Sequence, residues 1–252
     1  MKISKNGKPI DSVESWFEFA PPKEGRRQWV DERSAKELAK AFWCSGKACM
    51  PAELQDLLDS TSTLGHIEII EAWPEHKIAL DSFRGETRNA DLSAIAVGRT
   101  GTVALTIEAK ADESFGELIE TALAKAPEPS NIPKRIEMLM QGLFGRQTDL
   151  SKIRYQLLHG VAASLIFAAD QQAAAAVFVV FEIRGPSCSE ENLARNALDL
   201  ERFVTLLSSP PERLRVGHLS GPLTVPGAGK IPARMPLFIG KAIREVGAGA
   251  ER

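Results

Sequence analysis

Residues 91–110 read DLSAIAVGRTGTVALTIEAK, and the other predicted elements are arranged around this stretch. Two apolar runs, 92–97 and 102–107, flank the turn GRTG at 98–101. A turn containing glycine between runs rich in β-branched residues is typical of a β-hairpin. The sequence therefore predicts two paired antiparallel strands here.

Charged residues gather at one end of this hairpin. Asp91 opens the first strand, and Glu108 and Lys110 end the second. Because side chains alternate along a strand, Glu108 and Lys110 should share one face while Ala109 turns away. Tight pairing would bring Asp91 close to Glu108. We therefore expect two carboxylates and one ammonium group at one end of a sheet.

The remaining segments show helical and strand patterns in mixed order. Further strands are expected at 66–73, at 174–183 and, more weakly, at 214–219 and 235–240. Residues 77–80 either extend the strand at 66–73 or pair with it. Helices are expected at 34–45, 51–58, 116–126, 132–144, 151–167 and 190–207. The near-continuous apolar run at 174–183 suits an inner strand covered on both faces. The order predicts an α/β fold with a central mixed sheet flanked by helices.

The chain is expected to form a single domain over residues 1–252. Residues 1–33 form an N-terminal arm, irregular through residue 30, and residues 184–252 add a C-terminal helix and strands to the core at 34–183. The arm carries four aromatic residues that we expect to pack on the domain in preference to stacking on bases: Trp16, Phe17, Phe19 and Trp29. Capping boxes are expected at Ser34–Glu37 and Ser187–Glu190, with Glu37 acting only as a cap.

Composition narrows the classes of function. The chain has 31 Lys and Arg against 33 Asp and Glu, so contact with nucleic acid would need a local basic patch. The apolar region 161–183 is interrupted by polar residues at 170–172, so it predicts a buried helix and strand and not a membrane span. Three cysteines and no apolar leader favour a reducing, cytoplasmic setting. Cys44 and Cys49 lack a second ligand pair, which argues against zinc.

An acid-x-Lys triplet is a weak signal, because the chain holds two of them. Glu75-His76-Lys77 follows Pro74 in a turn-like setting, whereas Glu108-x-Lys110 ends a strand predicted to be buried. Buried strands rarely end in charges unless these are solvated or paired. A strand end that emerges into water with a simple ion pair remains open as the structural alternative.

The pattern Asp91…Glu108-Ala109-Lys110, within the order αβββαβ, resembles the PD-(D/E)XK nuclease superfamily, also called restriction-endonuclease-like. The resemblance covers roughly residues 34–183. The segments DESFG at 112–116 and RYQLLH at 154–159 also resemble an uncharacterised bacterial subgroup of that fold. Ala90 stands where the superfamily pattern has Pro, a position at which Pro is often missing.

The resemblance implies phosphodiester hydrolysis that depends on a divalent metal. It implies that Asp91, Glu108 and the backbone carbonyl of Ala109 hold Mg²⁺ or Mn²⁺, since hard oxygen ligands suit these ions. The metal would activate a water molecule, and Lys110 would orient that water and offset developing negative charge. Gln156, beside Tyr155, would support the site. The partner would be nucleic acid, with DNA expected first, and not a membrane.

Several alternatives stay open at this point. Gln156 could face solvent, Glu113 is expected to be a solvated loop acid, and Glu71 could be an additional acid of the site. The segment PGAGKI at 226–231 departs from a phosphate-binding loop at Thr224 and Ile231 and is expected to be a plain loop.

Two other functions compete with the nuclease. One is a non-catalytic binding module that keeps the fold, and the other is a hydrolase of a small phosphorylated molecule, which would need a closed pocket. A basic groove would favour nucleic acid, and its candidate residues are Arg84, Arg88, Arg99, Lys134, Arg135, Arg146, Lys152 and Arg154.

Overall fold

The computed structural model describes residues 1–83, 87–145 and 150–247. Its centre is a mixed sheet with strand order β2-β1-β5-β6-β7-β8-β10-β9. The strands are β1 (Lys2–Lys5), β2 (Lys8–Pro9), β5 (Glu68–Ile78), β6 (Arg88–Gly98), β7 (Gly101–Lys110), β8 (Ala175–Arg184), β9 (Ser220–Leu223) and β10 (Leu237–Glu245). A separate small hairpin pairs β3 (Trp43–Cys44) with β4 (Lys47–Ala48).

The predicted hairpin is the middle of this sheet. Strands β6 and β7 pair antiparallel from Leu92 opposite Ile107 to Gly98 opposite Gly101. Strand β8 lies parallel to β7, and β10 lies parallel to β8. Since β8 has strands on both sides and helices on both faces, its apolar run is buried almost throughout, as expected.

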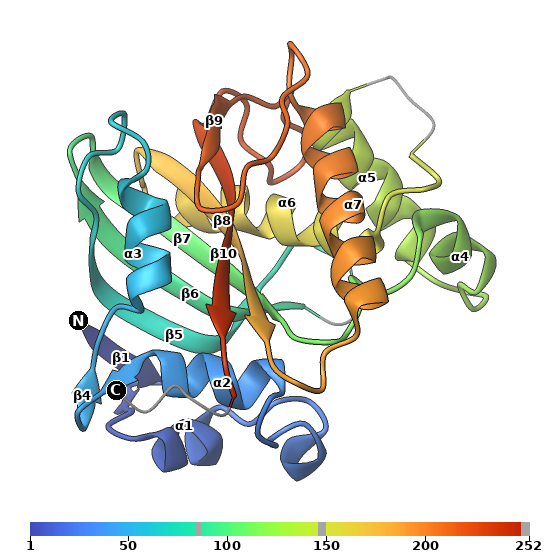
Figure 1. Cartoon of the computed structure of the whole chain (residues 1–252). Helices are drawn as coiled ribbons and strands as arrows, with labels where there is room; N and C mark the ends of the chain where they lie inside the picture. Colours follow the sequence, from blue (N-terminus) through green and yellow to red (C-terminus); the bar gives the residue numbers. More distant parts are fainter. Residues whose placement is uncertain (84–86, 146–149, 248–252) are drawn as a thin grey trace.

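Helices cover both faces of the sheet (Figure 1). One face packs against α1 (Val13–Phe19), α2 (Ser34–Ala41) and α3 (Ala52–Asp59). The other packs against α4 (Ile119–Ala124), α5 (Ile132–Phe144), α6 (Tyr155–Asp170) and α7 (Glu190–Leu207). Alternate side chains of β8 enter the two cores, with Phe181 on the first side and Phe178 on the second. The predicted α/β architecture, a central mixed sheet flanked by helices, is confirmed.

The prediction that residues 1–30 are irregular was wrong. They contain β1, β2, α1 and the short 3₁₀ helix Gly25–Arg27, because β1 finds a parallel partner in β5. The expected packing is confirmed for three of the four aromatic residues: Trp16 is 3% exposed, and Phe19 and Trp29 pack against the same core. Phe17 contacts the Trp29 ring.

Some helix and strand boundaries also differ from those predicted. The helix expected from residue 151 begins at Tyr155, because the extended backbone at Arg154 forms a bridge with Leu118. The strand expected at 214–219 lies instead at Ser220–Leu223, where β10 offers a pairing partner.

The two predicted capping boxes were wrong. Helix α2 begins at Ser34 itself, so Ser34 cannot cap it, and Glu37 accepts a hydrogen bond from the backbone N–H of Glu32 at 3.0 Å. Helix α7 is capped by Ser189 in place of Ser187, with the N–H of Asn192 as donor.

The cysteines bear on the predicted reducing setting. Cys44 and Cys49, which a reducing setting would keep as thiols, form a disulfide across the β3–β4 hairpin, while Cys188 is free. Within the ranges described, no helix is long and apolar enough to cross a membrane.

Candidate active site

The end of β7 carries two charged side chains into the protein interior. Glu108 is 2% exposed and Lys110 is 4% exposed, and both lie on the α6 side of the sheet, while Ala109 packs in the opposite core. The predicted sharing of one face is therefore confirmed. The alternative of a strand end emerging into water was wrong, because β8 and α6 cover this end of the strand.

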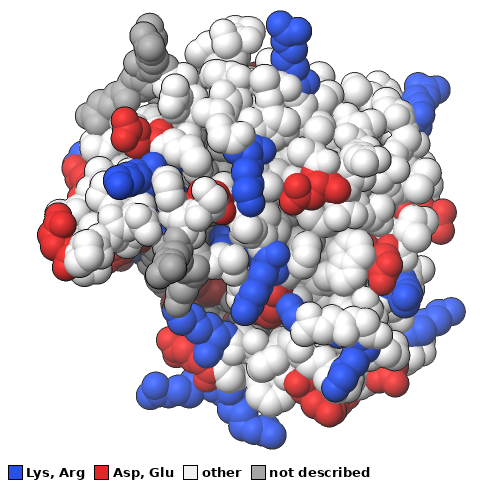
Figure 2. Space-filling model, turned by 180° about the vertical axis from the view of Figure 1, so that it is seen from behind, with Lys and Arg blue, Asp and Glu red and all other residues white. Residues whose placement is uncertain are grey.

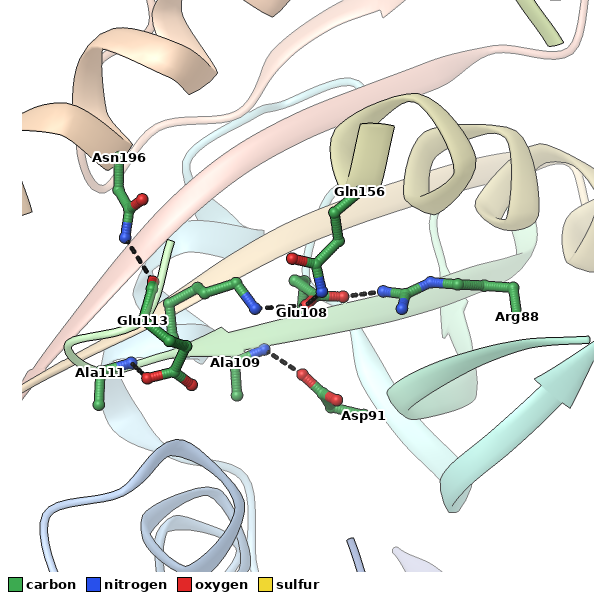
Figure 3. Close-up of polar contacts among 9 residues, drawn as sticks. Arg88, Asp91, Glu108, Ala109, Ala111, Glu113, Gln156 and Asn196 are labelled. Atoms are coloured by element: carbon green, nitrogen blue, oxygen red, sulfur yellow. Dashed lines mark hydrogen bonds and ion pairs between the residues drawn. The ribbon is translucent and has the colours of Figure 1, made fainter. Parts of the chain in front are cut away.

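Glu108 is the hub of the charged cluster. One of its oxygens, Oε1, accepts hydrogen bonds from Lys110 Nζ at 2.6 Å and from Gln156 Nε2 at 2.5 Å. The other oxygen accepts one from the Arg88 guanidinium. Figure 3 shows Gln156 reaching Glu108 from the helix above it and Arg88 reaching it from the right. Gln156 thus points into the site, and the solvent-facing alternative was wrong.

Asp91 lies beside Glu108 on the neighbouring strand. Its Oδ2 accepts a hydrogen bond from the backbone N–H of Ala109 at 2.7 Å (Figure 3). Burial raises the pKa of Asp91, and the charges of Lys110 and Arg88 offset part of that rise. The contact observed at Ala109 is made by its N–H group, so a metal-binding role for its carbonyl stays a prediction.

Burial also governs the charge of Lys110. It lowers the pKa of this ammonium group, and the carboxylates of Asp91 and Glu113 act in the opposite direction. The Lys110 Nζ atom also lies 5.6 Å from the centre of the Phe115 ring. A lysine held in this way can give up a proton more readily than one in water.

Glu75 lies at the site, although the sequence predicts a turn-like setting for its triplet Glu75-His76-Lys77. It lies within β5, not in a turn, and faces the position of Asp91, because Pro74 pairs with Leu92 and His76 with Ala90. Burial and the Asp91 charge raise the pKa of Glu75 to about 7. Strand register alone brings these acids together, so no local pattern could have identified Glu75.

The two other candidate acids, Glu113 and Glu71, lie in different places relative to the site. Glu113 is partly buried beside the cluster and accepts a hydrogen bond from the N–H of Ala111 at 3.1 Å, so it is not simply solvated (Figure 3). Glu71 instead contacts Ser4 Oγ at 3.0 Å and Lys2 Nζ at 3.5 Å on the β1 side, away from the site.

Arg88 and His159 complete the surroundings of Glu108. Arg88 begins β6, and its side chain is 13% exposed. Burial and the nearby charges of Arg88 and Lys110 lower the pKa of His159 well below its usual range, so this imidazole is neutral. The Tyr155 ring packs edge-on against His159 at 4.8 Å. The sequence indicated Arg88 only as a groove cation, because no local pattern predicts its hydrogen bond to Glu108.

These residues line a half-open cavity of about 1300 Å³. Segments 20–35, the β5 and β6 residues near Glu75 and Asp91, and helices α5 and α6 form its walls. Of the predicted groove cations, Arg88 and Arg135 line it, Arg84 and Arg146 lie outside the described residues, and Arg99, Lys134, Lys152 and Arg154 lie elsewhere. Figure 2 shows basic side chains beside and above acidic ones near the middle of one face.

The donor chemistry of the site fits a hard divalent cation. Within the part of the chain described, no group of three or more His, Cys, Asp or Glu side chains is arranged to hold a metal. Mg²⁺ needs fewer protein ligands, because it binds through one or two carboxylates and keeps its waters. Asp91 and Glu108 supply two carboxylates, and Glu75 lies across from Asp91 on the neighbouring strand. Glu108 would have to exchange Arg88 or Lys110 for the metal.

Comparison with known proteins places the chain in a family. The model of a family described as a domain of unknown function, DUF6946, matches residues 9–246. The chain belongs to the DUF6946 family. No curated protein and no solved structure matches it.

Proposed function

We propose that this protein is a divalent-metal-dependent nuclease that hydrolyses phosphodiester bonds of nucleic acid. The observation that carries the proposal is the convergence of Asp91, Glu108, Lys110 and Gln156 on one cavity. The order α3, β5, β6, β7, α6, β8 follows the αβββαβ order of the restriction-endonuclease-like fold, with α4 and α5 inserted. This order supports a core of that fold.

Each side chain has a task in this chemistry. Asp91 and Glu108 would hold Mg²⁺ or Mn²⁺, which supplies an activated water and stabilises charge on the phosphoryl group. Lys110, freed from Glu108, would donate a hydrogen bond to the attacking water or to a phosphoryl oxygen. Gln156 fixes the orientation of the Glu108 carboxylate through its 2.5 Å hydrogen bond. Arg88 would turn from Glu108 to the phosphate.

One observation favours a second candidate, a non-catalytic binding module. Both Glu108 oxygens already accept hydrogen bonds, from Arg88, Lys110 and Gln156. A cluster closed in this way needs no metal to balance its charge. The two candidates differ in whether added metal starts hydrolysis.

Cleavage assays test the proposal. End-labelled single- and double-stranded DNA and RNA are incubated with the protein in Mg²⁺, in Mn²⁺ and in EDTA. We expect cleavage with metal only, lost at least about a hundredfold in Lys110→Ala and retained in Lys125→Ala, whose side chain pairs with Glu117 on the surface. If wild type cuts no better than Lys110→Ala on every substrate, the catalytic role fails, and binding without cleavage would support the module.

A further inference from the structure

The wall of the cavity opposite α5 and α6 comes from residues 20–35, which we call the N-terminal wall. Its basic residues, Lys23, Arg27 and Arg33, line the same cavity as Asp91 and Glu108. All three residues precede the region that resembles the nuclease superfamily, which begins near residue 34. The wall is therefore a feature of this chain that the proposed chemistry does not use.

The balance of charge in the cavity indicates an anionic ligand. Seven basic and four acidic side chains line it, although the whole chain has a net charge of −2. The four acids, Glu75, Asp91, Glu108 and Glu113, gather at the hairpin end together with Arg88 and Lys110. The other five cations lie on the walls around them, where Arg135 is paired with Asp81. Such a field attracts phosphate groups and aligns them beside the acidic centre.

Two wall arginines are available to a ligand. Arg27 and Arg33 are exposed, and neither makes an ion pair or side-chain hydrogen bond with any residue in the described ranges, although the charge of Arg33 is near enough to act on the Asp112 carboxylate. Arg33 directly precedes α2, whose first turn has no side-chain cap, and Ser34 and Ala35 of that turn also line the cavity. Backbone N–H groups at a helix start add to the attraction that the arginines exert on a phosphate.

The burial of the acidic centre favours a single-stranded over a double-stranded nucleic acid. Glu108 and Lys110 are almost completely buried at the floor of the cavity, between the N-terminal wall and the α5–α6 wall. A duplex holds its phosphates on a stiff outer surface, whereas a single strand can bend one phosphate inward. Trp29, which packs on the Phe17 ring and against the core, also lines the wall.

The size of the cavity argues against a small phosphorylated molecule. Its volume of about 1300 Å³ exceeds the range of about 300–1000 Å³ that is usual for small-molecule sites. We propose that the N-terminal wall binds the phosphates of a single-stranded nucleic acid through Arg27 and Arg33 and so presents one phosphodiester to Asp91 and Glu108. This inference rests on the proposed function in taking those acids as the reacting centre.

Binding measured without metal tests the inference separately from catalysis. Fluorescence anisotropy in EDTA compares a short labelled oligothymidylate with its duplex, using wild type, Arg27→Ala/Arg33→Ala and the matched control Arg213→Ala/Arg215→Ala. The control pair is also exposed, removes the same charge and does not line the cavity. Circular dichroism checks whether each variant is folded.

We expect wild type to bind the single strand at least about tenfold more tightly than the duplex. The Arg27/Arg33 variant should lose about tenfold, and the slope of log K against log salt should fall by about 1.4, for two phosphate contacts on a single strand. The control should bind like wild type, and Arg27→Lys/Arg33→Lys should keep most of the affinity.

Three results would overturn the inference: no binding of the single strand by wild type, equal losses in the two alanine pairs, or duplex binding as tight as single-strand binding. Loss of binding in the Arg27/Arg33 variant with no cleavage by wild type would overturn the proposed function alone. The wall would then remain a nucleic-acid surface.

Discussion

Glu108 is the residue on which the site depends most. It is buried together with two positive charges, those of Arg88 and Lys110, and with the Gln156 amide. Taking charges out of water is costly, and only the mutual attraction within the cluster offsets that cost. Removing one charged member therefore leaves the opposite charges of the cluster buried without a partner.

The substitution Glu108→Gln tests this balance. It leaves two buried cations without their shared carboxylate, so we expect a loss of about 3–5 kcal/mol in the free energy of unfolding. Urea denaturation gives the value. Glu117→Gln is the control, because Glu117 is 46% exposed in its pair with Lys125 and should cost at most about 1 kcal/mol. Equal, small losses in both variants would contradict the buried ion cluster.

Glu75 predicts a pH dependence of stability. Its pKa is raised from 4.5 to about 7 in the folded protein, so between these values the folded state holds a proton that the unfolded state has lost. Stability should therefore fall as pH rises through this window, by about 3 kcal/mol from this group. Wild type and Glu75→Gln are compared by urea denaturation in EDTA at several pH values.

The comparison between the two proteins isolates the contribution of Glu75. The variant should gain on wild type as pH rises from 4.5 to 7, because glutamine has no proton to lose. A stability of the variant relative to wild type that stays constant across the window, or that falls as pH rises, would show that the pKa of Glu75 is not raised in this way.

At the scale of elements, α6 holds Gln156 over the hairpin. It can lie this close to β8 because Gly160 faces the Phe178 ring: a Cβ atom built at residue 160 would approach Phe178 Cε2 to 3.0 Å. The position of the amide over Glu108 thus depends on a glycine one helical turn away.

The substitution Gly160→Val should push α6 away from β8. We expect it to cost about 1–3 kcal/mol of stability, the usual range for overpacking, and to reduce the metal-dependent cleavage rate by displacing Gln156. Ala169→Val, at a half-buried position near the end of α6, is the control and should change both properties little. Full activity and stability in Gly160→Val would show that the helix does not set the site.

Local patterns predicted the elements that form the site. The 91–110 hairpin, the buried strand at 174–183 and the helix with Gln156 all follow from apolar periodicity and turn residues within the segment itself. What the sequence missed depends on distant partners: β1 needs β5, Glu75 meets Asp91 only through strand register, and Arg88 reaches Glu108 only after β6 pairs with β7. Neither propensity nor spacing encodes such pairings.

At the scale of the whole molecule, the first and the last strand of the described residues both belong to the central sheet. Strand β1 pairs with β5, and β10 pairs with β8 over its full length, from Leu237 opposite Ala176 to Glu245 opposite Arg184. The 34–183 core is therefore not a closed unit. Without β10, the apolar strand β8 would become an exposed edge, which is prone to aggregation.

Truncation tests this unity. We expect the full chain to unfold in one cooperative thermal transition, and the fragment 34–183 to aggregate or to lack such a transition, because it loses strands on both sides of the sheet. Circular dichroism with size-exclusion chromatography measures both. A monomeric fragment that melts cooperatively would show that the termini are additions to an independent core.

A crystal of the protein soaked in Mn²⁺ shows whether Asp91 and Glu108 bind a divalent metal, on which the proposed hydrolysis depends. We expect an anomalous peak at about 2.0–2.6 Å from carboxylate oxygens of both residues, with Arg88 or Lys110 turned away from Glu108. Glu108 still bonded to Arg88, Lys110 and Gln156, with no peak between the two carboxylates, would contradict this expectation.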